Sequence, residues 1–391
     1  MRFLFYTHSL ISDWNHGNAH FLRGVMRELQ LRGHTCVALE PADSWSRKNL
    51  VAERGEAAIA RFHTTFPSLK TRIYKDDYDH EGAIDGADVV IVHEWTDPAL
   101  IARIGRARRD GASFILLFHD THHRAVTRES DISRLPLGEF DGVLAFGETV
   151  RQRYLKAGWA DQVFTWHEAA DVKLFRPQRD RMCDSDLVWI GNWGDDERSR
   201  ELHEYLIEPV RSLGLRGDAF GVRYPDGAID AMKSAGIRYR GWIANADAAV
   251  QYGYYRVTVH IPRRPYVAAL RGIPTIRVFE ALACGVPLVC APWEDSEELF
   301  RSGQDFLVAK SGDDMKRLLF NVLWEPQLAM DLARNGLETI RARHTCAHRA
   351  VELESIISRL RAIPRERAPD AKLQDTNSQV VNAQETKVKT R

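Results

Sequence analysis

Hydrophobic strands alternate with helix-like segments in the first half of the chain. Runs typical of buried strands cover residues 2–9, 35–41, 87–95, 112–120 and 140–147. Apolar residues recur at helical spacing between the first two runs, at Leu22, Val25, Met26 and Leu29. Continuous apolar strands separated by helices are typical of a parallel sheet covered on both faces. The first half is therefore predicted to form a Rossmann-like α/β domain.

A second series of the same kind follows an interruption near the middle of the chain. Its strand-like runs cover residues 186–194, 218–224, 237–243, 256–262, 286–293 and 305–310. The pattern predicts an N-terminal domain at residues 1–168, a linker at 169–184 and a C-terminal domain at 185–345. It also predicts a helix at 346–362 that crosses back to the N-terminal domain and a disordered tail at 363–391. The tail prediction rests on composition, since the last 27 residues contain no aromatic residue and no isoleucine.

Composition is that of a globular protein, with 44% hydrophobic and 28% charged residues. The 54 basic and 54 acidic residues balance, which argues against nucleic acid or an anionic membrane as a partner. The five cysteines form no CxxC pair and are interpreted as free thiols in a reducing cytosol. We expect no signal peptide and no transmembrane segment, hence a cytoplasmic location.

The first candidate for chemistry is "SLISDWNHGNAH", residues 9–20, between the first strand and the first helix. Ligands of open parallel sheets bind at the carboxyl ends of strands, where this loop is predicted to lie. Asp13, His16 and His20 cluster there, and Gly17 allows a backbone to approach a ligand. No GxGxxG pattern is present, so a dinucleotide is not predicted.

A second cluster, "FHDTHHRAV", begins at the carboxyl end of the strand at 112–120. The histidine spacing suggests a metal, but no cysteine and no second carboxylate at a familiar spacing accompany it. We predict no metal and expect His119 to direct a ring nitrogen at a sugar hydroxyl.

The second half offers "WIGNWGDDERSR", residues 189–200, directly after its first strand. Gly191 and Asn192 lie in the expected turn, and Arg198 is placed to reach a phosphate. A solvated helix start with surface ion pairs is the alternative interpretation of this segment.

The segment "GIPTIRVFEALACGVPLVCAPW", residues 272–293, reads as an apolar helix and a buried strand, yet it contains Arg277 and Glu280. Three residues apart, they are neighbours on one helix face. One interpretation is an intrahelical salt bridge. The other is a cleft at the helix start, where the glutamate accepts hydrogen bonds from a diol and the arginine and helix amides hold phosphates. The preceding basic stretch, 260–272, is either a solvated loop or a segment that orders over a diphosphate.

The stretch "IRVFEALACG" resembles the nucleotide-binding signature of GT-B glycosyltransferases, and is most similar to the CgeB-like variant of the glycosyltransferase group 1-like family. "FHD", "DVKLFRP" and "LFRSGQDFLVA" resemble other parts of the same enzymes, so the resemblance covers roughly residues 1–362. It implies two Rossmann-like domains facing across a cleft.

The resemblance also implies roles for individual residues. Glu280 would bind the ribose of a nucleotide-sugar, and the amides of Ile273, Thr275 and Ile276 would face its diphosphate. His119 would contact the sugar, and Trp242 would lie near the base. Many relatives carry a glutamate where this chain has Gly272, and their diphosphate clamp would be replaced here by Arg277 or Arg198.

These observations predict a metal-independent glycosyltransferase whose only cofactor-like ligand is its nucleotide-diphosphate sugar. The acceptor is left open among glycans, lipid-linked groups, proteins and small molecules. An inverting reaction would need a base such as His16, His20 or Asp13, whereas a retaining reaction would need none. A nucleotide-sugar 2-epimerase and a non-catalytic binding module of the same fold are the alternatives.

Overall fold

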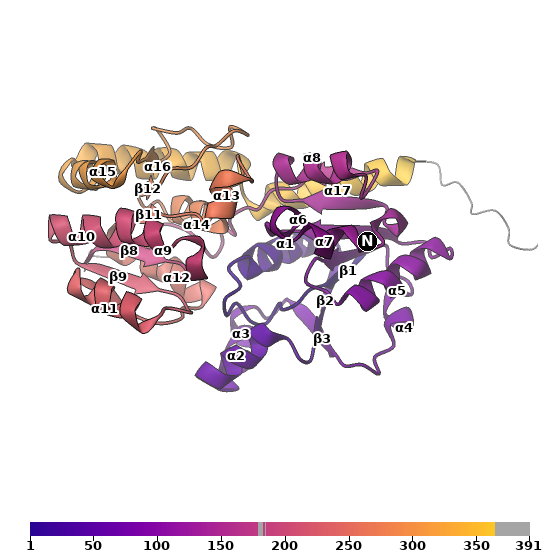
Figure 1. Cartoon of the computed structure of the whole chain (residues 1–391). Coiled ribbons are helices and arrows are strands. Elements are labelled where there is room, and N and C mark those ends of the chain that lie inside the picture. Colours follow the sequence, from indigo (N-terminus) through magenta and orange to yellow (C-terminus); the bar gives the residue numbers. More distant parts are fainter. Residues whose placement is uncertain (179–182, 184, 364–391) are drawn as a thin grey trace, which may run out of the picture.

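The computed structural model describes residues 1–178, 183 and 185–363, and it contains two α/β domains (Figure 1). In the N-terminal domain a parallel sheet has the order β3-β2-β1-β4-β5-β6-β7. Its strands are β1 (Arg2–Tyr6), β2 (Thr35–Pro41), β3 (Lys70–Tyr74), β4 (Val89–His93), β5 (Ile115–Asp120), β6 (Gly142–Ala145) and β7 (Val163–Thr165). Its helices are α1 (Ala19–Leu31), α2 (Trp45–Arg54), α3 (Ala57–Thr65), α4 (His80–Ile84), α5 (Pro98–Arg109), α6 (Arg124–Thr127), α7 (Glu129–Ser133) and α8 (Glu148–Ala157).

The C-terminal domain holds a second parallel sheet, in the order β10-β9-β8-β11-β12-β13. The strands are β8 (Ser185–Ile190), β9 (Gly217–Phe220), β10 (Ile237–Tyr239), β11 (Tyr255–His260), β12 (Leu288–Cys290) and β13 (Leu307–Val308). The helices are α9 (Ser199–Leu202), α10 (Glu208–Leu213), α11 (Asp226–Ser234), α12 (Asn245–Gln251), α13 (Arg264–Ala268), α14 (Ile276–Ala283), α15 (Gly312–Trp324) and α16 (Pro326–Arg343), with a π-helical turn at His203–Ile207.

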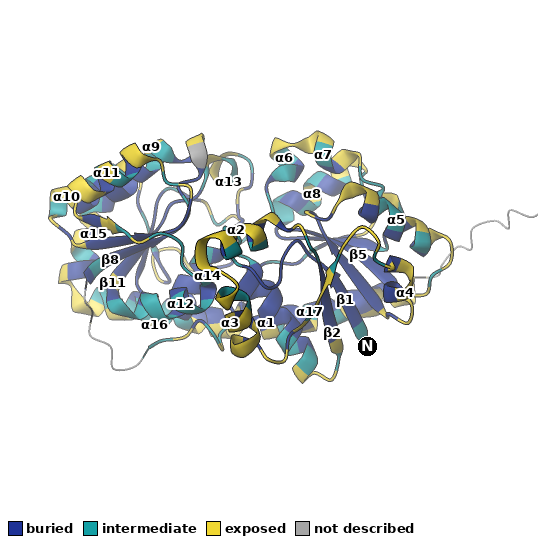
Figure 2. Ribbon diagram, turned by 90° about the horizontal axis from the view of Figure 1, so that it is seen from below, coloured by how far each residue is buried: buried dark blue, intermediate teal, exposed yellow. Residues whose placement is uncertain are grey.

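Both sheets reverse their strand order once, between β1 and β4 and between β8 and β11. Helices cover both faces of each sheet, so the strands are buried and the outer helix surfaces exposed (Figure 2). At such a reversal the connections run to opposite faces and leave a crevice at the carboxyl ends of the strands. The two domains turn these ends toward each other, and the predicted fold class is confirmed.

The last helix, α17 (Cys346–Ala362), crosses back onto the N-terminal domain, where it packs against α1 and β5. The buried indole Nε1 of Trp166 donates a hydrogen bond to the carbonyl oxygen of Arg349, at 3.0 Å. At the surface, Glu354 accepts a 2.9 Å hydrogen bond from Arg32 Nε and lies 2.7 Å from His34 Nε2. The chain thus ends by tying its second domain to its first.

Replacing Trp166 with phenylalanine is expected to lower the free energy of unfolding by about 2 kcal/mol. The change leaves a buried carbonyl without its donor and removes part of a buried ring. Urea denaturation measures the loss, and Trp324→Phe, at a residue 53% exposed on α15, is the matched control. An equal effect of the two substitutions would contradict the role of Trp166 in anchoring α17.

The structure adds strands that the sequence patterns did not indicate. β3 and β7 lie at opposite edges of the first sheet, and they were not predicted. β3 is largely exposed, because an edge strand buries little of its surface. Parts of the predicted linker, 179–182 and 184, and the predicted tail from residue 364 onward lie outside the described residues.

Two further expectations concern thiols and membranes. Cys36, Cys284, Cys290 and Cys346 are buried free thiols, whereas Cys183 is exposed. In the part of the chain that the structure describes, no helix combines the length and the apolar character that a membrane crossing requires.

Candidate functional site

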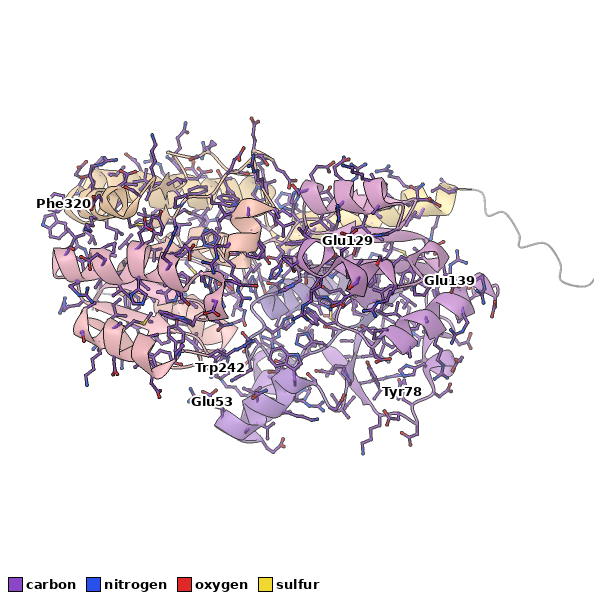
Figure 3. The ribbon with its side chains drawn as sticks, in the orientation of Figure 1. Glu53, Tyr78, Glu129, Glu139, Trp242 and Phe320 are labelled. Atoms are coloured by element: carbon purple, nitrogen blue, oxygen red, sulfur yellow. The ribbon has the colours of Figure 1, made fainter. Side chains whose placement is uncertain are left out.

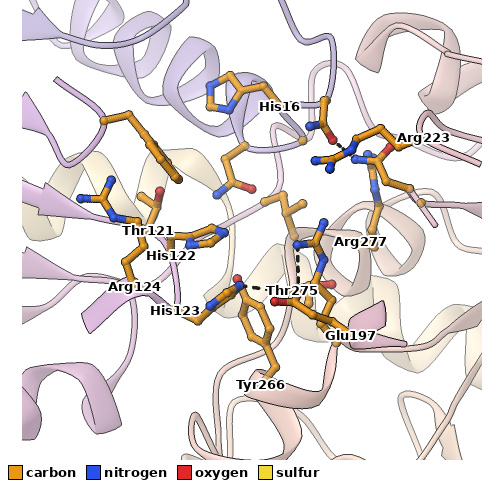
Figure 4. A pocket seen from close by; sticks show the side chains of 18 of the residues that line it. His16, Thr121, His122, His123, Arg124, Glu197, Arg223, Tyr266, Thr275 and Arg277 are labelled. Carbon is orange, nitrogen blue, oxygen red and sulfur yellow. Dashed lines mark hydrogen bonds and ion pairs between the residues drawn. The ribbon is translucent and has the colours of Figure 1, made fainter. Parts of the chain in front are cut away.

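A cavity of about 940 Å³ lies between the two domains, at the carboxyl ends of β1, β4, β5, β8 and β11 (Figure 4). The N-terminal domain lines it with His8, Trp14, Asn15, His16, Gly17, Asn18, Trp45, Asn49, His93, Trp95, Thr121, His122, His123, Arg124, Thr127 and Arg128. The C-terminal domain contributes Trp189, Ile190, Gly191, Asn192, Glu197, Arg198, Arg223, His260, Arg263, Tyr266, Thr275, Ile276 and Arg277. The cavity therefore gathers residues from all four sequence clusters, the fourth through the first turn of α14.

The electrostatic character of the cavity is strongly positive. Its lining contains six arginines and one glutamate. Four of the arginines, Arg198, Arg223, Arg263 and Arg277, belong to the C-terminal domain. A lining of this composition attracts anions, and guanidinium groups suit phosphate oxygens in particular.

The first turn of α14 forms part of the same wall. Thr275, Ile276 and Arg277 all line the cavity, and no side chain caps the start of the helix. The first N–H groups of a helix have no acceptor within the helix, so they are available to an anion. The Thr275 side chain is positioned by β11, because its hydroxyl oxygen lies 3.0 Å from Nε2 of His260 at the end of that strand.

The two charges inside α14 form a buried ion pair. Arg277 donates a hydrogen bond to one oxygen of Glu280, and the other oxygen lies 3.1 Å from His20 Nδ1. Glu280 is fully buried, and burial opposes its ionisation, but Arg277 and His20 outweigh that effect and lower the pKa of the carboxyl. Glu280 thus orients Arg277 from beneath the cavity wall. It does not line the cavity, where the predicted ribose contact would require it.

Arg198 has a bracing role in addition to its charge. Its guanidinium donates to the carbonyl oxygens of Trp193 at 3.3 Å, Ile261 at 2.9 Å and Asn192. Burial lowers the pKa of Arg198 to about 9, so the group remains charged at neutral pH. Arg198 therefore lines the cavity as a charged group, and it holds the turn that contains Gly191 and Asn192.

Hydrogen bonds from Arg23 hold the loop that follows β1. Its guanidinium donates to the carbonyl oxygens of Leu10 and Ile11, both at 2.9 Å, and to Asp13 at 2.8 Å. Asp13 also accepts the backbone N–H of Asn245, at 3.2 Å, from the other domain. Asp13 is thus engaged in a structural ion pair outside the cavity lining, and its predicted role as a base is not supported.

Two of the predicted histidines also lie outside the cavity lining. His20 is fully buried against Glu280, so the structure does not support it as a base. His119 packs with Trp166 and His93, at ring-centroid distances of 4.9 and 5.6 Å, and burial lowers its pKa to about 3. His93, in register with His119 on the neighbouring strand, lines the cavity, whereas His119 is not among the lining residues.

His16 is the predicted catalytic residue that the structure does bring to the cavity. Its ring centroid lies 4.2 Å from that of His8 and 6.4 Å from that of His93. Burial, followed by the neighbouring His8 and His93, lowers the pKa of His16 well below its usual range. The imidazole is therefore neutral at pH 7, and its unprotonated nitrogen can accept a hydrogen bond from a hydroxyl group in the cavity.

Two residues predicted to hold the nucleotide lie elsewhere. Trp242 lines a separate cavity of about 350 Å³ beneath α2, where Arg54 stacks at 5.6 Å from its ring (Figure 3). Ile273 is buried against Gly147 of the N-terminal domain. Neither residue is among those that line the large cavity.

Sequence reasoning missed several residues of the lining. Arg263 and Tyr266 come from the basic stretch 260–272, whose two interpretations were left open, and the structure brings both side chains to the cavity. His8 and His93 stand at the carboxyl ends of β1 and β4, so the rule that singled out His119 would also have found them. Arg223 lies after β9, where no motif marked it.

The histidines do not assemble a metal site. Across residues 1–178, 183 and 185–363, no group of three or more histidine, cysteine, aspartate or glutamate side chains is arranged to hold a metal ion.

Comparisons with known proteins agree with this architecture. Residues 198–355 match a family model described as "Glycosyl transferase-like". No curated protein matches the chain.

Solved structures match over nearly the whole chain. Sucrose-phosphate synthase from Thermosynechococcus elongatus is 15% identical with a TM-score of 0.63, over 93% of this chain and 99% of that one. A glycosyltransferase from Rickettsia africae is 12% identical with a TM-score of 0.65, covering 93% and 99%. Anabaena HepE, solved with UDP-glucose, is 11% identical with a TM-score of 0.66, covering 92% and 100%. The chain therefore has the two-domain GT-B fold of these structures, and its residues 198–355 are similar to the glycosyl transferase-like family.

Proposed function

We propose that the chain transfers a sugar from a nucleotide-diphosphate donor, which binds in the cavity between the domains. The observation that carries the proposal is the arginine-rich wall of the C-terminal domain beside the uncapped start of α14. A diphosphate is the part of the donor that such a wall recognises. The structure of HepE with UDP-glucose supports a nucleotide-sugar as the donor class.

The same groups supply the electrostatic part of the reaction. When the sugar leaves, negative charge develops on the diphosphate oxygen that was bonded to the anomeric carbon. Arg263, Arg277 and the first amides of α14 are fixed before the reaction, so they stabilise that charge without reorganising. We infer a metal-independent reaction, in which guanidinium groups do the work that a divalent cation does in other transferases.

His16 is the proposed base. It is neutral, it lines the cavity opposite the arginine wall, and it can take the proton of an acceptor hydroxyl as that oxygen attacks the anomeric carbon. This assignment makes the reaction inverting. His16→Gln is then expected to lower kcat by about 100-fold or more, with the affinity for nucleoside diphosphate unchanged. A variant with nearly full kcat would indicate a retaining reaction that needs no protein base.

The proposal is tested by screening nucleotide-sugars for release of nucleoside diphosphate, with and without a crude pool of acceptors. Transfer predicts that the acceptor pool accelerates release from one donor. Isomerisation of the donor without any acceptor would instead support a 2-epimerase. Binding of the donor with no turnover under either condition would support a non-catalytic binding module.

A further inference from the structure

The wall of the cavity opposite the arginines is aromatic. Trp14, Trp45 and Trp95 line it from the N-terminal domain, and Trp45 and Trp95 are 43% and 41% exposed. Large indole surfaces in contact with water are uncommon, and gathered in a cavity they indicate a binding surface. We name these three residues the aromatic wall.

The aromatic wall is held rigidly. Ser46 Oγ donates to the carbonyl oxygen of Trp14 at 2.7 Å and lies 2.9 Å from Ser12 Oγ, which fixes the loop after β1 to the first turn of α2. Trp14 Nε1 donates to Glu53 at 2.7 Å. These hydrogen bonds fix the start of α2, so its first residue, Trp45, is positioned in the absence of a ligand.

His8 adds an unsatisfied polar group beside the indole of Trp45. The two rings are stacked, with centroids 5.6 Å apart and an interplanar angle of 10°. His8 is only 7% exposed and lines the cavity, and neither of its ring nitrogens has a hydrogen-bond partner within the described part of the chain. Burial lowers its pKa to about 4, so the ring offers one N–H donor and one acceptor at neutral pH. A hydroxyl group satisfies both kinds of site.

The charge of this wall narrows the class of ligand further. Among the lining residues that the N-terminal domain contributes, none is an aspartate or glutamate. The amides of Asn15 and Asn49 stand beside the tryptophans. Two arginines, Arg124 and Arg128, line the same side, and the Arg124 guanidinium lies 4.4 Å from the centroid of the Trp95 ring. A cationic acceptor such as an amine would therefore be repelled, whereas a neutral ring with hydroxyl groups finds the exposed indole of Trp45 beside uncharged donors and acceptors.

We propose that the acceptor is a carbohydrate, which stacks the C–H face of one ring on Trp45 and places a hydroxyl group at His8. The proposal rests on the function proposed above and names its second substrate. In the reaction, the acceptor oxygen forms a bond to the anomeric carbon of the donor sugar as the bond to the diphosphate oxygen breaks. The diphosphate leaves with that electron pair, and the acceptor proton passes to His16.

The test is binding of methyl glycosides of the common hexoses, observed by saturation-transfer NMR on the protein saturated with nucleoside diphosphate. We expect transfer to the ring protons of one face of at least one glycoside, and a loss of affinity of about 10-fold in Trp45→Ala. Trp45→Phe should retain most of the affinity, and His8→Phe should lose it while keeping the stack. Trp324→Ala, on the distant α15, is the control and should bind like the wild type.

The outcomes separate the two proposals. No binding of nucleoside diphosphate by the wild type would overturn the donor site, whereas diphosphate binding without binding of any glycoside would overturn only the carbohydrate acceptor. Equal glycoside affinity in Trp45→Ala and the wild type would also overturn it. Octyl glycosides are tested beside the methyl glycosides. A lipid-linked sugar acceptor predicts higher affinity for the octyl series, whereas a free sugar acceptor predicts equal affinities for the two series.

Discussion

Replacing Arg263 with glutamine is expected to weaken the binding of nucleoside diphosphate by about 10- to 100-fold. The loss corresponds to one charge-assisted hydrogen bond to a phosphate, about 1.5–3 kcal/mol. Arg263 is suited to this test because its side chain lines the cavity, where its Nη1 lies 3.1 Å from Glu197. Glutamine keeps much of the side-chain length and removes the charge. Calorimetric titration of wild type and variant measures the change.

The neighbouring residue provides the control for this prediction. Arg264 has the same side chain, is 52% exposed, lies 3.6 Å from Glu201 and does not line the cavity. Arg264→Gln is expected to bind nucleoside diphosphate like the wild type. If both substitutions weakened binding equally, the effect would come from the net charge of the protein, and the assignment of Arg263 to the diphosphate would be wrong.

Acidification from pH 7 to pH 5 is expected to lower the free energy of unfolding by about 5 kcal/mol. Burial depresses the pKa of nine histidines in the described part of the chain, including His8, His16, His93, His119, His122, His260 and His344. The folded forms of the seven named histidines stay neutral over this range, whereas unfolded histidines take up protons below about pH 6.5. The unfolded state therefore gains stability as the pH falls, by at most about 2 kcal/mol for each group.

Buried carboxyl groups reduce this net effect. Burial raises the pKa of Glu94 and of Glu168 well above the usual range, so these groups bind protons more readily in the folded state and stabilise it on acidification. The histidines outnumber them, and the net change remains a loss of stability. Above pH 7 the histidines contribute no further change, since they are neutral in both states.

The contribution of a single histidine can be isolated at His119, which lies among Phe21, Trp166 and His93. In His119→Phe the difference in stability between pH 7 and pH 5 should shrink by about 2 kcal/mol. Urea denaturation at the two pH values measures it. A difference as large in the variant as in the wild type would show that His119 is protonated in the folded protein.

The architecture was accessible from the sequence because buried parallel strands leave a strong signal. The strands within the runs 87–95 and 112–120 pack on both faces, so residues 89–92 and 114–118 are all apolar. The edge strand β3 was missed because its residues are exposed or only partly buried and form no apolar run, and β7 has only three residues. The crossover helix α17 was recognisable from its one apolar stripe, which packs on α1.

Only part of the site could be predicted from the sequence, for a physical reason. A position at the carboxyl end of a strand is visible in the sequence, but the direction of its side chain depends on packing. His119 and His93 stand on adjacent strands in register, and His93 lines the cavity whereas His119 does not. Arg277 and Glu280 were both singled out, yet the tertiary contact with His20 decides that Glu280 is buried and Arg277 faces the cavity.

The central claim is that the arginine wall and the first turn of α14 hold the diphosphate of a nucleotide donor. Its most direct test is calorimetric titration of the wild-type protein with the mono- and diphosphates of uridine, guanosine, adenosine, cytidine and thymidine. We expect at least one diphosphate to bind, and to bind about 10-fold or more tightly than the monophosphate of the same nucleoside. Equal affinities for the two members of every pair, or no binding of any diphosphate, would contradict the account.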